Sequence, residues 1–316
     1  MDNTPKIATG PLTFSNRLKR FVRHKLRKPY KKIRGSETLV SFLNQRNIRN
    51  FKAHPFELSA LELRIVEDLR EDGISITTLD SLLPEKTYQP HIESYALQLK
   101  MRSVPGRKKT FLQYLWGENI EVLDLENPFN ALAIEPGVLG IVNAYMGLRS
   151  HFFFSSGNVT VPLSHDAQAL GSQRWHRDPG SGDPRIVKIF LYINDVPTEA
   201  GPFEYVKQSH NEGRFGNIFP FVQPDGVYPS LGAVEEHAAL KDRIVSGVGK
   251  AGTLIFCDTT GLHRGGYSRG KERIMATGAY TSPGSLQGFR YTLSPRALEN
   301  ALDLPLVSRY GLGLVK

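Results

Sequence analysis

The residue pattern of this 316-residue chain changes near position 150, and this change limits the folds that the chain can adopt. Beyond it, short runs rich in Val, Ile, Phe and Tyr alternate with turns rich in Gly, Pro and Asp. We expect strands over residues 151–163, 185–193, 203–207, 253–257 and 274–280. Many short strands with turn residues between them favour a sandwich or a jelly roll.

The part of the chain before this change has a mostly helical pattern. Ser59 and Glu62 have the spacing of a capping box ahead of an apolar run that Gly73 can end. Pro136 opens a second apolar stripe of helical period. Helices first and strands later predict an α+β domain whose helices support one sheet.

These patterns suggest one large domain behind a short leading segment. We expect a flexible start with a basic arm at residues 1–35, followed by a single domain at 36–316. Within that domain we expect a helical part at 36–150, a β core at about 150–285 and a C-terminal segment at 286–316. The glycine- and proline-rich stretch 210–235 is long for a connection, which is typical of a lid, a substrate loop or a disordered insert.

The formal net charge of +9 is concentrated in one short segment. Residues 17–34 contain ten basic residues and no acidic residue, so the rest of the chain carries a formal charge of −1. Specific nucleic-acid binding by the domain is therefore not expected. Leu18, Phe21, Val22 and Leu26 fall at helical spacing in this arm. It can form an amphipathic helix that contacts an anionic surface, or a solvated helix packed on the domain edge.

Other bulk features point to an ordinary globular protein of a reducing compartment. Cys257 is the only cysteine, which excludes an internal disulfide and a cysteine-rich zinc site. The first residues lack the apolar core of a signal peptide, and no stretch approaches the roughly 20 apolar residues of a membrane span. We therefore expect a cytoplasmic enzyme.

Three residues have the types and spacing of a metal site. His176 and Asp178 lie two apart, and side chains two apart on a strand point the same way. His263 follows the apolar run 252–257 in a glycine-rich turn, where it can face a cavity. Two histidines and one carboxylate are typical of non-haem iron(II), because they leave coordination positions open for a co-substrate and oxygen. The same set also suits zinc.

Arg273 is a candidate for binding a carboxylate. It lies ten residues beyond His263, at the head of the predicted strand 274–280. A guanidinium is a rigid fork that fits a carboxylate, although an arginine at a strand start can equally be a surface residue.

Several separated motifs resemble the phytanoyl-CoA dioxygenase-like family, in the order that family has them. They are Trp175-His176-Arg177-Asp178, the runs 185–196 and 199–206, Ser209-His210, Gly252 to Phe256, His263 and Arg273. The resemblance covers roughly residues 130–282. This chain departs from the family pattern in two places. Lys207-Gln208 stands where the family commonly has Pro-Gly, and Arg273 follows His263 after ten residues where about eleven are expected.

This resemblance implies a fold, a set of cofactors and a reaction. The fold would be a double-stranded β-helix, a cupin-like jelly roll buttressed by helices from the N-terminal half. Iron(II) would be held by His176, Asp178 and His263, and 2-oxoglutarate by Arg273 with Phe190 and Gln173 nearby. Together with O2, and ascorbate as an in vitro aid, these would hydroxylate a small organic substrate and release succinate and CO2.

Asp178 also narrows the reaction type, because related iron halogenases lack this carboxylate. Hydroxylation, desaturation or ring closure therefore fits better than halogenation. The alternatives from other classes are a non-catalytic β-barrel binding module and a zinc-dependent hydrolase on the same fold. The Arg273 position favours the oxygenase.

Overall fold

The computed structural model describes residues 37–106, 109–117, 122–164, 166–179, 183–221, 227–285 and 291–315. The basic arm at residues 17–34 lies outside the described residues, so its role stays a prediction. In the ranges given above, no helix combines the length and the apolar character that a membrane crossing requires. The cytoplasmic location also stays a prediction.

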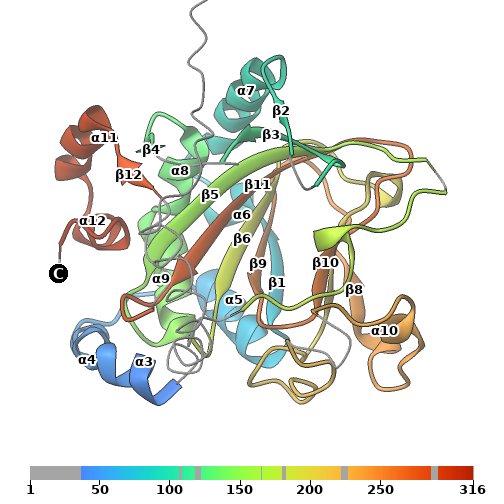
Figure 1. The fold of residues 1–316 in the computed structure, drawn as a ribbon. Coiled ribbons are helices and arrows are strands. Elements are labelled where there is room, and N and C mark those ends of the chain that lie inside the picture. Colours follow the sequence, from blue (N-terminus) through green and yellow to red (C-terminus); the bar gives the residue numbers. More distant parts are fainter. Residues whose placement is uncertain are drawn as a thin grey trace, which may run out of the picture.

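The architecture is α+β, with a large antiparallel sheet of seven strands in the order β1-β9-β6-β11-β5-β3-β2 (Figure 1). The strands predicted from the sequence are confirmed, with ends shifted by a few residues. They are β5 (His151–Thr160), β6 (Val187–Tyr192), β7 (Phe203–Val206), β9 (Thr253–Asp258) and β11 (Arg273–Thr281). Of these, β5, β6, β9 and β11 belong to the large sheet, and β7 belongs to a second one.

The helical half also contributes strands that the sequence pattern did not predict. β1 (Ile74–Thr78) pairs with β9, while β3 (Leu112–Trp116) pairs with β5 and carries β2 (Val104–Pro105) at the edge. The β1 segment Ile-Ser-Ile-Thr-Thr is β-branched and alternating, so its composition suits a strand. The sheet therefore extends beyond the predicted β core.

Helices from the first half of the chain pack against one face of this sheet. They are α5 (Ala60–Glu71), α6 (Leu79–Leu82), α7 (Tyr88–Lys100), α8 (Pro128–Ala133) and α9 (Pro136–Met146), with α3 (Glu37–Leu43) and α4 (Gln45–Ala53) before them in the chain. The predicted capping box is present at the start of α5, where Ser59 and Glu62 satisfy each other's backbone N–H groups. Gly147 ends α9 in the left-handed conformation at φ 68°.

The two faces of the large sheet have different partners because side chains alternate along each strand. On β6, Val187, Ile189 and Leu191 belong to the core formed with the helices. Phe190 and Tyr192 point the other way, into a core shared with Phe203 and other residues of the second sheet. The second face therefore holds the space in which a site can form.

A smaller antiparallel sheet lies on that second face, in the order β10-β7-β8 (Figure 1). Besides β7, this sheet contains β8 (Ile244–Ser246) and β10 (His263–Gly265). The short helix α10 (Ala233–Glu236) precedes β8 in the chain. The C-terminal part adds β12 (Thr292–Leu293), parallel to β4 (Val122–Leu123), and the helices α11 (Pro295–Asn300) and α12 (Leu306–Gly311). Hydrophobic residues of these last elements pack against the helical core.

Candidate metal centre

Backbone pairing brings the predicted ligands together although they are far apart in sequence. His176 and His263 form an isolated antiparallel bridge, in which each backbone N–H donates to the other residue's carbonyl at 3.0 Å. Two residues on, the backbone N–H of Asp178 donates to the Thr259 carbonyl at 2.8 Å. The His176–Asp178 segment is thus extended, as predicted, and is held by hydrogen bonds along the segment that leads into β10.

Both histidines are fixed in the same tautomer. Nδ1 of His176 lies 2.8 Å from the Arg174 carbonyl, and Nδ1 of His263 lies 2.9 Å from the Gly261 carbonyl. A carbonyl oxygen only accepts hydrogen bonds, so each Nδ1 carries the proton and donates it. The lone pair is therefore on Nε2 of both rings, which is the arrangement that metal-binding histidines commonly have.

The third side chain completes a compact group of possible ligands. One ligand atom from each of His176, Asp178 and His263 lies within 4.8 Å of the others. Nε2 of His263 is 3.6 Å from Oδ2 of Asp178, and the two imidazole centroids are 4.3 Å apart. One metal ion placed between these atoms could bind all three residues.

The charges of this group suit a divalent cation. Burial, followed by the proximity of His176, lowers the pKa of His263 to about 3, and burial also lowers the pKa of His176. Burial alone would raise the pKa of Asp178, but the Lys188 ammonium and the two histidines hold it below the usual range. At neutral pH the donors are two neutral imidazoles and a carboxylate, the forms that bind a metal.

A cavity of about 380 Å³ opens from these ligands along the inner face of the large sheet. Its floor includes Phe190 of β6, and Met275 and Thr277 of β11. Phe203, on the smaller sheet, stacks on Phe190 with ring centroids 4.5 Å apart. The cavity is thus enclosed by both sheets, with the metal ligands in its wall.

Arg273 is the first residue of β11 and lies against this cavity, 2% exposed. One guanidinium nitrogen donates to the Gly201 carbonyl, and the other donates to the Thr160 hydroxyl at 3.2 Å. Its Nε–H has no hydrogen-bond partner among the described residues. Gly265 lies beside it, and a Cβ at this position would stand 3.1 Å from the guanidinium. The structure therefore excludes the surface-arginine interpretation and leaves this side chain a free donor.

The two other predicted pocket residues are placed differently. Phe190 lines the cavity, next to the metal ligands. Gln173 is buried in the turn before His176, and its side-chain oxygen accepts the Leu170 backbone N–H at 3.1 Å. The described cavity lining does not include Gln173, although its amide nitrogen is without a hydrogen-bond partner in the described structure. Contact between Gln173 and a co-substrate stays a prediction.

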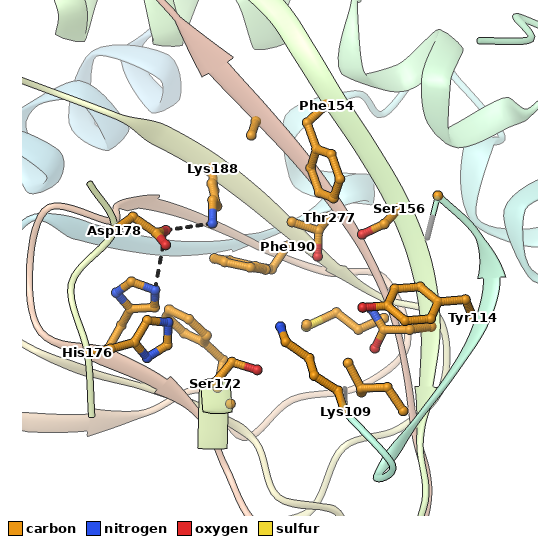
Figure 2. A pocket seen from close by; sticks show the side chains of 18 of the residues that line it. Lys109, Tyr114, Phe154, Ser156, Ser172, His176, Asp178, Lys188, Phe190 and Thr277 are labelled. Atoms are coloured by element: carbon orange, nitrogen blue, oxygen red, sulfur yellow. Dashed lines mark hydrogen bonds and ion pairs between the residues drawn. The ribbon is translucent and has the colours of Figure 1, made fainter. Parts of the chain in front are cut away.

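Two lysines in the cavity were not among the predicted site residues. Figure 2 shows Lys188 beside Asp178, and Lys109 reaching in from the opposite side. Nζ of Lys188 lies 2.6 Å from Oδ2 of Asp178. Lys188 is charged between apolar neighbours on β6, two residues before Phe190, so strand alternation could have identified it. Lys109, just before β3, gives no such signal.

Arg177, between the two first ligands, anchors the long segment that follows β7. Its buried guanidinium donates to the carbonyls of Ser209, Thr260 and Phe219, and to two others nearby. Tyr228, from the same segment, has its ring centroid 6.1 Å from that of His176. The described part of the stretch 210–235 is thus held to the metal-ligand segment by Arg177, and Tyr228 approaches His176.

Comparisons with known proteins agree with this geometry. Residues 124–275 match the family model of phytanoyl-CoA dioxygenase. The epimerase SnoN, solved with Fe3+, alpha ketoglutarate and nogalamycin RO, is 18% identical over 71% of this chain and 84% of its own, with a TM-score of 0.50. EctD from S. alaskensis, solved with bound Fe, is 17% identical over 78% of this chain and 86% of its own, also with a TM-score of 0.50.

At this identity the two solved structures show a shared fold and nothing further. No curated protein matches the chain in sequence. The family match, however, spans His176, Asp178, His263 and Arg273. Residues 124–275, a little under half of the chain, are therefore similar to the phytanoyl-CoA dioxygenase family, as the sequence motifs suggested.

Proposed function

We propose that this protein is an iron(II)- and 2-oxoglutarate-dependent dioxygenase that hydroxylates a small organic substrate. The observation that carries the proposal is one cavity that contains both the His176–Asp178–His263 group and the buried Arg273 guanidinium. A metal group alone would suit iron or zinc, and a buried arginine alone would suit any anion. Their combination suits a co-substrate that chelates a metal and also carries a distal carboxylate.

The residues of the chain would have distinct roles in this reaction. His176, Asp178 and His263 would hold iron, with the Nδ1 hydrogen bonds fixing both rings. When bound, iron(II), 2-oxoglutarate and O2 supply the oxidant, with succinate and CO2 as co-products. Arg273 would orient 2-oxoglutarate by its distal carboxylate, because its guanidinium lines the cavity and has N–H donors that the protein does not use.

The surroundings of the group would protect the chemistry from water. Phe190 and Phe203 stack beside the ligands and give the cavity an apolar wall. Exclusion of water strengthens electrostatic contacts inside the cavity and limits side reactions. We also propose that the two antiparallel sheets form the halves of a double-stranded β-helix, which the shared fold with SnoN and EctD supports.

The test is whether the purified full-length chain converts 2-oxoglutarate to succinate with iron(II) and ascorbate. Wild type should consume 2-oxoglutarate and O2, whereas His263→Ala should do neither while keeping its unfolding temperature within a few degrees. A chain that binds iron but never consumes 2-oxoglutarate would contradict the proposal. Ester hydrolysis by the zinc-loaded protein would instead favour a hydrolase.

A further inference from the structure

The cavity carries more positive charge than the proposed cofactors neutralise. Among the described residues that line it, the cations are Lys109, Lys188 and Arg273, and the carboxylate is that of Asp178. If the proposed function is correct, a divalent metal and a dicarboxylate co-substrate cancel each other's charge. Two positive charges then remain in a partly desolvated space, where an unpaired charge is costly.

Lys188 lies at a distance from the predicted co-substrate arginine. On the strand ladder it is opposite Ala279, while Arg273 begins the same strand six residues earlier. At about 3.3 Å per residue, roughly 20 Å of strand separates these two levels. That distance joins backbone positions, whereas the Lys188 ammonium lies 2.6 Å from Asp178, at the metal centre. A co-substrate that spans from Arg273 to the metal would use Arg273 for its distal carboxylate and leave Lys188 for a second anion beside the metal.

The immediate neighbours of Lys188 are a metal ligand and apolar side chains. Its ammonium contacts Asp178, and both side chains are about one-fifth exposed. Phe154 lies on the same side of the cavity as Lys188 (Figure 2), and Pro179 and Ile186 also belong to the cavity lining. When Asp178 binds a metal, its negative charge no longer neutralises Lys188 fully, so a second anion beside Lys188 would be stabilised. The apolar side chains would contact the carbon skeleton of the molecule that carries this anion.

Lys109 adds a second cation on the opposite wall. Burial, followed by the nearby Lys188 charge, lowers the pKa of Lys109, while Asp178 partly opposes this shift. The two lysines therefore repel each other across the cavity. An anion between them would relieve that repulsion.

We propose, on the basis of the proposed function, that the substrate is an organic anion whose carboxylate or phosphate binds Lys188 beside the metal centre. A charge-assisted hydrogen bond of this kind corresponds to roughly a ten- to hundredfold gain in affinity over an uncharged analogue. Lys188 would thus select the substrate class and place the carbon skeleton next to the metal.

Calorimetric titration of the full-length chain tests this, with zinc as a redox-silent metal and saturating 2-oxoglutarate. The probes are hexanoate with its neutral partner hexanamide, and hexyl phosphate with hexanol. Wild type should bind at least one anionic probe about tenfold or more tightly than its neutral partner. The preferred anion distinguishes a carboxylate substrate from a phosphate substrate.

Three variants separate anion recognition from structural effects. Lys188→Met should lose the preference for the anion, and Lys188→Arg should retain most of it. Lys250→Met removes a lysine of an exposed pair with Asp195 and should behave as wild type. The same titrations show whether zinc and 2-oxoglutarate bind at all; if they do not, the proposed function fails first.

The inference fails by itself in either of two outcomes. In the first, zinc and 2-oxoglutarate bind, but anionic and neutral probes are indistinguishable, including the case where neither gives heat. In the second, the preference for the anion survives in Lys188→Met. A weaker zinc affinity in Lys188→Met with an unchanged anion preference would assign Lys188 to positioning Asp178 only.

Discussion

Replacing Arg273 by leucine tests the co-substrate pocket most directly. The guanidinium is 2% exposed and donates to Gly201 and Thr160, which uses two of its five N–H donors, and its Nε–H has no partner among the described residues. The proposed function requires at least one charge-assisted hydrogen bond from Arg273 to the distal carboxylate. Such a bond is worth about 1.5–3 kcal/mol, and every 1.4 kcal/mol is roughly tenfold. Half-saturation should therefore need about ten- to a hundredfold more 2-oxoglutarate.

The assay is succinate formation at varied 2-oxoglutarate concentration, with thermal unfolding measured in parallel. Unfolding matters because Arg273→Leu also leaves the Gly201 carbonyl and the Thr160 hydroxyl without their donor. Arg269→Leu is a matched control, since Arg269 also donates to a backbone carbonyl, that of Ser164, but lies outside the described cavity lining. It should not change the 2-oxoglutarate dependence.

An unchanged 2-oxoglutarate dependence in Arg273→Leu would refute the assignment. A different cation would then hold the distal carboxylate. Arg264 is a poor substitute, because it is already paired with Glu204 and Glu235 and covers the Trp175 ring. Lys109 and Lys188 would be the next residues to replace.

Further predictions concern the metal, stability and the arm. His263→Ala should abolish tight binding of iron(II), as measured by metal content after gel filtration, because it removes one of three donors. If the variant keeps the same metal content as wild type, His263 is not a ligand. Asp178→Gly should end substrate oxidation and open a position that halide can occupy, and full product yield would show that Asp178 is not a ligand. Burial lowers the pKa of His151 to about 4, so the unfolded chain takes up a proton near pH 6.5 that the folded protein resists. Above about pH 6.5 His151 is neutral in both states and has no effect, and as the pH falls from 6.5 towards 4 it lowers the free energy of unfolding by up to about 1.4 kcal/mol per pH unit. His151→Phe should therefore show a shallower loss of unfolding temperature over this range. An equally steep loss would assign the acid sensitivity to other groups. Deleting residues 1–35 should leave 2-oxoglutarate turnover nearly unchanged but remove salt-sensitive binding to anionic vesicles, since exposed charges are screened beyond about 10 Å at 0.1 M salt. If full-length and truncated protein bind vesicles equally at low salt, the arm is only a solvated helix.

The features that the sequence predicted well depend on local pattern. The strands β5, β6 and β11 have six to ten residues each and contain Val, Ile, Thr, Phe or Tyr, residue types that favour strands whatever their partners. His176 and Asp178 lie two apart in an extended segment, so they share a face wherever that segment is placed. The short strand β1 was missed because it follows α5 almost directly, and five residues carry little periodic signal. Its pairing with β9, far along the chain, stabilises it as a strand.

The order of residues along the chain supplies the groups that the chemistry needs: two histidines, a nearby carboxylate and an arginine at a strand start. How these groups act depends on contacts between distant segments. The carbonyls of Arg174 and Gly261 accept from Nδ1 and leave Nε2 of both rings for a metal. Strand register directs Lys188 into the cavity, while Arg264 is paired with acidic side chains elsewhere. Residue identity fixes the possible donors, but backbone hydrogen bonds between distant segments fix where each donor points.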